Sequence, residues 1–105
     1  MRVAENPEAQ VVDVGNRLDV GTVAEVRPRL HEAVDTGQGD LIVDLSGLEM
    51  IDATGLGVLV GTHRRAAAAG RRLILRRVPP RVMRVLAVTR LNRVLTVELP
   101  VGAVA

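Results

Sequence analysis

Short apolar runs alternate with longer stretches of helical period along this chain, and that alternation limits its fold more than any other feature. Four runs are expected to be strands, at residues 10–14, 41–45, 72–76 and 94–99. Helical patterns separate them, as the crossovers of a parallel sheet require. The order predicts an α/β fold, with one single-layer, mixed and mostly parallel sheet of about four or five strands and helices packed on it.

The core of such a fold must be aliphatic, because the 105 residues include no Phe, Tyr or Trp. The chain has 19 Val, 13 Leu and 3 Ile, and each contributes roughly 1.5–3 kcal/mol when fully buried. The length fits a single domain over residues 1–105, with a core at about 10–99. We expect residues 1–9 and 100–105 to be loosely held ends.

Composition excludes several kinds of chemistry. Without cysteine there is no disulfide, thiolate metal site or cysteine nucleophile. All 14 basic residues are arginine, so no lysine is present for a phosphate-binding loop or a Schiff base. No apolar run approaches the roughly 20 residues that span a bilayer, and residues 1–7 lack a signal peptide's apolar segment. A cytoplasmic protein without a membrane partner is expected.

Local signals mark the helix ends. Thr22 to Glu25 reads as a capping box, in which the Thr hydroxyl and the Glu carboxylate each satisfy a free backbone amide. Pro28 predicts a bend near Ala24, and Gly37 a stop. A second helix should run to about residue 69, and a third should begin at residues 79–80. The face that the second helix is expected to bury comprises Leu56, Leu59, Val60, His63 and Ala66 or Ala67.

The charges are unevenly distributed. Residues 1–52 carry 4 Arg and 11 acids, a net −7, whereas residues 53–105 carry 10 Arg and one acid, Glu98, a net +9. The simplest interpretation is that the halves interleave and attract each other, and without aromatic residues a nucleic-acid partner is not expected. An acidic protein partner is the alternative to a plain solvated surface for the arginines at 71, 72, 76, 77, 81, 84, 90 and 93.

One hexapeptide, Asp52-Ala53-Thr54-Gly55-Leu56-Gly57, departs from local rules. Interior glycines cost a helix about 1 kcal/mol each relative to alanine, so helix propensity does not explain them. A carboxylate and a hydroxyl stand just before them. Such local disagreement is typical of functional sites. The structural alternative is that Thr54 is only an N-cap, Asp52 a turn residue and the glycines close helix–sheet contacts.

The hexapeptide, preceded by Ile42-Val43-Asp44-Leu45-Ser46, resembles the STAS domain, specifically the bacterial anti-sigma factor antagonists. The resemblance covers residues 10–99 and includes Arg17-Leu18-Asp19 followed by Thr22. It implies a protein that, unphosphorylated, binds an anti-sigma factor, often a serine/threonine kinase, and so frees a sigma factor. Phosphorylation of the residue two places after the Asp abolishes binding, and a phosphatase restores it.

By motif position the acceptor is Thr54, because Ala53 replaces the hydroxyl residue common beside it. The resemblance assigns partner binding to Asp19, Asp52, Ala53, Thr54, Gly55, Leu56 and Gly57. Thr54 is expected at or next to the helix N-cap, with Asp19 and Asp52 adding negative charge to a contact surface. Another use of the domain is also open, as an accessory subunit of a lipid or anion transporter or a stress-signalling scaffold that binds without phosphorylation.

Enzyme classes have weaker support. The glycines from Gly55 to Gly61 match a dinucleotide-binding pattern poorly, and 105 residues cannot build both halves of that fold. His31 is expected to be solvated and His63 partly buried, and neither forms a triad or a metal site with Ser46 or the acids. We therefore expect no enzymatic activity and no cofactor, in a monomer or a weak homodimer.

Overall fold

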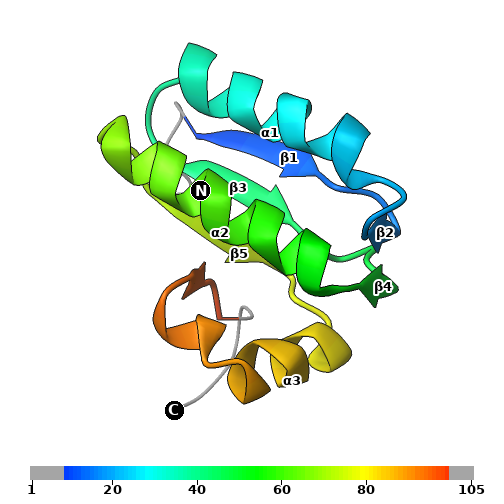
Figure 1. Ribbon diagram of the computed structural model, residues 1–105. Coiled ribbons are helices and arrows are strands. Elements are labelled where there is room, and N and C mark those ends of the chain that lie inside the picture. Colours follow the sequence, from blue (N-terminus) through cyan, green and yellow to red (C-terminus); the bar gives the residue numbers. More distant parts are fainter. Residues whose placement is uncertain (1–8, 100–105) are drawn as a thin grey trace, which may run out of the picture.

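A computed structural model describes residues 9–99 of the chain, and it contains three α-helices and two small sheets (Figure 1). The strands are β1 (Gln10–Asp13), β2 (Arg17–Leu18), β3 (Leu41–Asp44), β4 (Met50–Ile51), β5 (Leu73–Arg76) and β6 (Thr96–Val97). The helices are α1 (Val23–Thr36), α2 (Ala53–Ala68), α3 (Pro80–Val88) and the short 3₁₀ helix η1 (Leu91–Arg93). The expected ends at 1–9 and 100–105 lie, apart from residue 9, outside the described residues.

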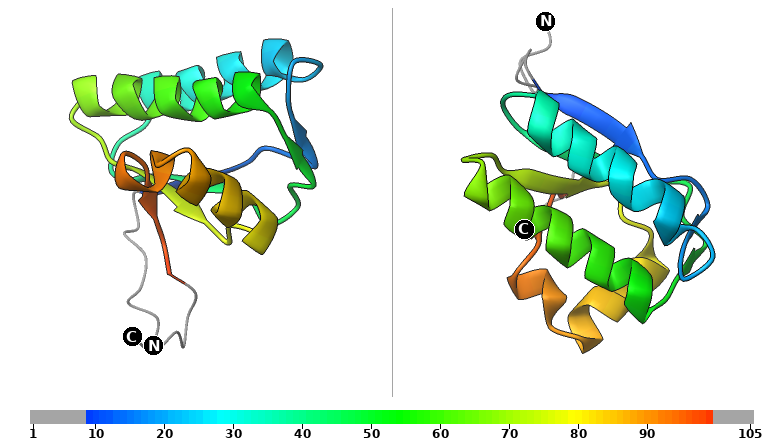
Figure 2. Two further views of the ribbon diagram at one scale, coloured as in Figure 1. Left: turned by 60° about the horizontal axis from the view of Figure 1, so that its bottom comes forward. Right: turned by 45° about the horizontal axis from the view of Figure 1, so that its top comes forward.

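The main sheet has the strand order β1-β3-β5-β6, and every pairing in it is parallel. The α/β prediction is thereby confirmed. Helices α1 and α2 pack side by side on one face of this sheet, as Figure 2 shows, while α3 and η1 lie beyond β5 at the β6 end (Figure 1). Helices α1, α2 and α3 each lie in the sequence between two parallel strands of the main sheet, because parallel strands need a crossover connection.

The core is aliphatic, as composition required. Alternate residues of β3 and β5 point at α1 and α2, and these side chains are fully buried: Leu41, Val43, Leu73 and Leu75. From α1 the buried stripe recurs every three or four residues, at Val23, Val26, Leu30, Ala33 and Val34. The burial of these branched side chains is the main favourable contribution to folding.

Ion pairs join the acidic and the basic halves of the chain. Arg65 on α2 binds Asp35 on α1 at 2.7 Å, and Arg72 binds Asp40 at 2.9 Å. These contacts confirm that the two halves interleave in one fold. The energetic value of the Arg65–Asp35 pair is small because both side chains are exposed.

Some local expectations were wrong. Thr22 precedes α1, but its hydroxyl makes no capping bond to the helix and serves the preceding loop instead. The last strand covers only 96–97 of the expected 94–99. Helix α1 continues through Pro28 as one element.

The buried stripe of α2 is rotated from the expected one. It consists of Gly55, Val58, Leu59, Thr62 and Ala66. Leu59 and Ala66 were expected there, whereas Leu56, Val60 and His63 are only partly buried and Ala67 is exposed. Small and polar residues occupy buried positions because α2 lies close to its neighbours, and a hydropathy pattern does not reveal that. The partial burial expected of His63 is confirmed.

Candidate functional site

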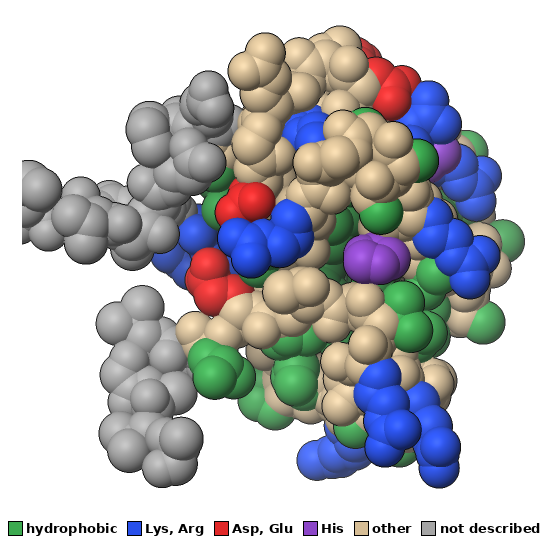
Figure 3. Space-filling model, turned by 90° about the vertical axis from the view of Figure 1, so that its left-hand side faces the viewer, with side chains coloured by type: hydrophobic (Ala, Val, Ile, Leu, Met, Phe, Trp, Pro, Cys, Tyr) green, Lys and Arg blue, Asp and Glu red, His purple; other side chains and the backbone are tan. Residues whose placement is uncertain are grey.

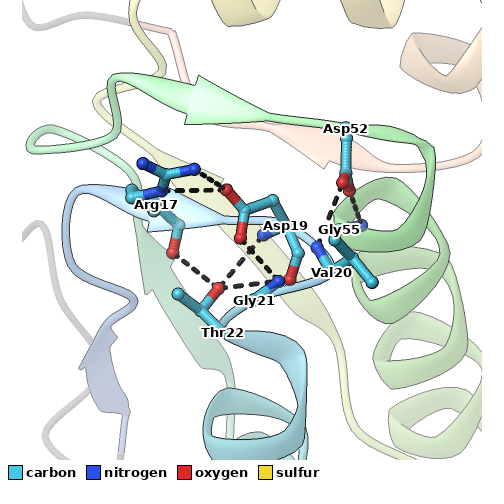
Figure 4. A network of polar contacts seen from close by, with 7 residues as sticks. All are labelled: Arg17, Asp19, Val20, Gly21, Thr22, Asp52 and Gly55. Carbon is cyan, nitrogen blue, oxygen red and sulfur yellow. Dashed lines mark hydrogen bonds and ion pairs between the residues drawn. The ribbon is translucent and has the colours of Figure 1, made fainter.

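The hexapeptide lies at one end of the molecule, beside a second, two-stranded parallel sheet. Strands β2 and β4 pair with each other, with Arg17 opposite Met50 and Leu18 opposite Ile51. The β2–α1 loop and the first turn of α2 meet there (Figure 4). Residues far apart in the sequence are thus brought together at the start of α2.

Asp52 joins these two segments. Its Oδ1 accepts a hydrogen bond from the Gly55 amide at 2.8 Å, which makes it the N-cap of α2. Its Oδ2 accepts one from the Val20 amide at 3.0 Å, from the β2–α1 loop (Figure 4). The hydrogen bonds from the Gly55 and Val20 amides lower the pKa of the Asp52 carboxyl, because they stabilise its charged form.

Asp19 organises the loop from within. Only 4% of the residue is exposed, and its carboxylate binds the Arg17 guanidinium at 2.7 Å and the Gly21 amide at 2.9 Å. Thr22 completes the network: its hydroxyl accepts from the Asp19 amide at 3.1 Å and donates to the Arg17 carbonyl at 3.0 Å (Figure 4). The expectation that Asp19 adds negative charge to an exposed surface is therefore wrong, because its charge is buried and paired.

The two glycines of the hexapeptide have different surroundings. A Cβ on Gly55 would overlap the Leu18 carbonyl oxygen, so this glycine allows α2 to pack against β2. Gly57 is exposed, and a Cβ there would meet nothing within 4 Å. The close-contact interpretation therefore holds for Gly55. Gly57 instead leaves the exposed face of α2 without a side chain at that position.

Thr54 is exposed in the first turn of α2. The N-cap is Asp52, so Thr54 is the second helical residue rather than the cap or its neighbour. Among residues 9–99, no hydrogen bond is made by its hydroxyl. Ala53 beside it is exposed and Leu56 is partly buried. A kinase or a protein partner could therefore reach the Thr54 hydroxyl without unfolding the helix.

Three residues of this end escaped the sequence reasoning as site residues. Val20 is 74% exposed and Met50 is 48% exposed, so apolar side chains border the first turn of α2. Arg17 holds Asp19 in place. A two-residue strand has no periodicity, so β2 and β4 gave no signal, and the exposure of Val20 could not be predicted from the sequence.

The groups gathered at this end of the molecule are a hydroxyl, a carboxylate and apolar side chains. In the stretch 9–99, no group of three His, Asp or Glu side chains is placed to hold a metal ion. His31 and His63 lie on α1 and α2, each away from this end of the molecule, and no helix within the same stretch could cross a membrane. A hydroxyl, a carboxylate held by two amides and two apolar side chains are suited to contact another protein.

A family model described as "Mlab, STAS domain" matches residues 1–98. The anti-sigma-B factor antagonist of Staphylococcus aureus (strain NCTC 8325 / PS 47) is 34% identical over 87 residues, which cover 83% of this chain and 81% of that protein.

Two solved proteins share the fold. The crystal structure of TM1081 from Thermotoga maritima aligns with a TM-score of 0.82, 20% identity, and coverage of 92% of this chain and 84% of that one. SpoIIAA in its unphosphorylated form aligns with a TM-score of 0.67 and 20% identity, over 93% of this chain and 86% of that one. SpoIIAA of Bacillus in its phosphorylated form aligns with a TM-score of 0.66 and 22% identity, over 90% of this chain and 86% of that one.

Proposed function

The chain belongs to the STAS domain family, and we propose that it acts as an anti-sigma factor antagonist switched by phosphorylation of Thr54. Unphosphorylated, it binds an anti-sigma factor of the serine/threonine kinase type in the cytoplasm and so releases a sigma factor. The phosphorylated form does not bind, and a phosphatase restores binding. The domain acts as a ligand of its partner and not as an enzyme.

The exposed Thr54 hydroxyl in the first turn of α2 carries this proposal. A phosphoacceptor must enter a kinase active site, and the neighbouring Ala53 and Gly57 are small enough to leave access open. The relatives named anti-sigma-B factor antagonists support the partner class, and SpoIIAA is a protein of this fold with a phosphorylated form. Val20 and Met50 would supply apolar contact on either side.

Charge explains how a phosphate would prevent binding. The group adds about −1.5 to −2 at neutral pH, beside the carboxylate of Asp52. Asp52 already uses the Gly55 and Val20 amides, so those donors are not free for the phosphate. The positive end of the α2 dipole tolerates the charge within the domain. A partner surface fitted to a neutral hydroxyl would have to desolvate a dianion, which costs several kcal/mol.

The test is phosphorylation in vitro followed by binding. The protein is incubated with ATP and candidate anti-sigma factor kinases, the modified residue is mapped by mass spectrometry, and binding is measured by calorimetry. We expect one phosphate, on Thr54. The Thr54→Ala variant should bind whether or not ATP has been supplied, and Thr54→Glu should bind at least about tenfold more weakly.

Thr36 supplies the matched control, since it is an exposed threonine at the end of α1. The Thr36→Glu variant should bind as the unmodified protein does. Phosphate on another residue, or equal affinities for Thr54→Ala and Thr54→Glu, would contradict the switch. Binding that ignores Thr54 but co-purifies with an ATPase and membrane subunits would favour the transporter-subunit alternative.

A further inference from the structure

Few acidic residues lie near the last helices of the described chain, and α3 meets one of them, Glu49, at its start beside Arg81. No acid occurs between residues 53 and 97. The arginines nearest the acidic half are paired across the junction, as Arg72 is with Asp40 and Arg77 with Asp44. Glu98, the last acid, binds Arg76 at 3.0 Å. Within residues 9–99, no arginine of α3 or η1 makes an ion pair.

Four arginines of this region are exposed. Arg81 lines a hollow together with Glu49 at the start of α3, and the other three are Arg84 on α3, Arg90 in the connection, and Arg93 on η1. Within residues 9–99 their guanidinium groups make no hydrogen bond or ion pair. Val88 is 79% exposed and Val94 46% exposed in the same segment. We use the name arginine surface for five of these residues, Arg84, Val88, Arg90, Arg93 and Val94. Figure 3 shows basic side chains projecting from the lower end of the molecule, with apolar and no acidic side chains beside them.

Arg90 holds a backbone conformation that does not favour it. Its φ is 62°, in the left-handed region, where the helix ends and the chain turns into η1. Glycine adopts this conformation without steric cost and is the usual residue just after a helix. An arginine at that position adds conformational strain, and its guanidinium group makes no hydrogen bond or ion pair within residues 9–99 that would compensate for it. Backbone outliers of this kind cluster at binding and switch regions.

We propose that the arginine surface is a docking site for an acidic segment of another protein, separate from the Thr54 site. Exposed valines among unpaired guanidinium groups fit a partner segment that carries both apolar and carboxylate side chains. This chain already uses the required geometry elsewhere, since Arg65 donates two hydrogen bonds to Asp35, at 2.9 and 2.7 Å. The absence of aromatic residues argues against single-stranded nucleic acid as the occupant.

The proposal is tested by NMR titration of the ¹⁵N-labelled full chain with a synthetic acidic amphipathic peptide of Glu, Leu and Ala. We expect chemical-shift changes confined to residues 80–95 and an affinity that falls as salt is raised. The triple variant Arg84→Gln, Arg90→Gly, Arg93→Gln should bind at least about tenfold more weakly. Arg90→Gly alone should bind more weakly yet unfold at a higher denaturant concentration.

The control pair is Arg27→Gln with Arg64→Gln, two exposed arginines on α1 and α2 that should leave the affinity unchanged. A peptide with Lys in place of Glu should not bind. The proposal is overturned if the shifts spread equally to Arg27 and Arg64, or if the triple variant binds as before. It is also overturned if duplex DNA or phosphatidylglycerol vesicles bind this face more tightly than the peptide. None of these readouts involves Thr54.

Discussion

The α-carbon of Gly55 lies so close to the main-chain carbonyl oxygen of Leu18 that a methyl group on Gly55 would overlap it. This contact sets how near α2 approaches β2. A methyl group at this position would also crowd the Ile51 side chain, whose Cγ1 would lie 3.1 Å from it. The placement of Thr54, one residue before Gly55, therefore depends on a residue that has no side chain.

Replacing Gly55 by alanine should destabilise the fold by about 1–3 kcal/mol, because backbone must shift to make room. The matched change Gly61→Ala should stabilise it by up to about 1 kcal/mol, since a Cβ there meets nothing within 4 Å and alanine favours the helix. Urea unfolding followed by far-ultraviolet circular dichroism measures both. Equal effects of the two substitutions would show that Gly55 is not a close contact.

The Asp52→Ala variant should lose both the α2 cap and the tie to the β2–α1 loop. We expect a melting temperature lower by about 4 °C or more, and faster hydrogen exchange at the Val20 amide. Glu25→Ala is the control. No side-chain bond of Glu25 to the helix start exists among residues 9–99, so its removal should leave the melting temperature nearly unchanged. A larger fall in melting temperature for Glu25→Ala than for Asp52→Ala would instead support the predicted capping box of Thr22 and Glu25.

The Asp52 carboxyl should titrate below the ordinary aspartate pKa of 3.8, because its charged form accepts the Gly55 and Val20 amides. A pKa lowered in the folded state gives stability that is present above the unfolded pKa and lost as pH falls through the folded one. Carboxyl ¹³C NMR gives the pKa directly. The difference in unfolding free energy between the wild type and Asp52→Asn should shrink only as the pH falls from the unfolded-state pKa of this carboxyl through its folded-state pKa. A pKa of 3.8 or higher would contradict the two bonds.

Arg71 should matter far more than its neighbour Arg72. The Arg71 guanidinium donates to the carbonyls of Ala33 and Val34 in the last turn of α1, at 2.7 and 2.9 Å, and to that of Gly39 at 2.8 Å. Arg71→Met should cost about 1.5–3 kcal/mol, because these acceptors lose a charged donor. Arg72→Met removes a single ion pair, in which the Arg72 side chain is 65% exposed, and should cost less. Urea midpoints of the two variants decide the comparison.

Periodicity predicted the main sheet and its helices because their residues repeat over several turns or pairs. The four long runs became β1, β3, β5 and β6, and Pro80 begins α3 as expected. Strands β2 and β4 were missed because two residues carry no period. Their position depends on pairing with each other, which is a contact between distant segments.

The site could be predicted only in part. The motif indicated Asp52 and Thr54, but not that Asp52 binds the Val20 amide 32 residues away in the sequence. Thr22 was misread because its hydroxyl has two local partners, the Asp19 amide and the Arg17 carbonyl, that compete with the helix. Asp19 was expected on the surface, since a sequence does not reveal that Arg17 folds over it.

The β2–β4 pair has a practical consequence. Among residues 9–99 it shares no strand with the four-stranded sheet, so the end of the molecule that holds Thr54 lies outside the main sheet. Segments 14–22 and 46–57 contribute Val14, Leu18 and Leu48 to the aliphatic core, so a graft between homologues must keep these three buried residues. Under the proposed function, such an exchange should change which anti-sigma factor the domain binds.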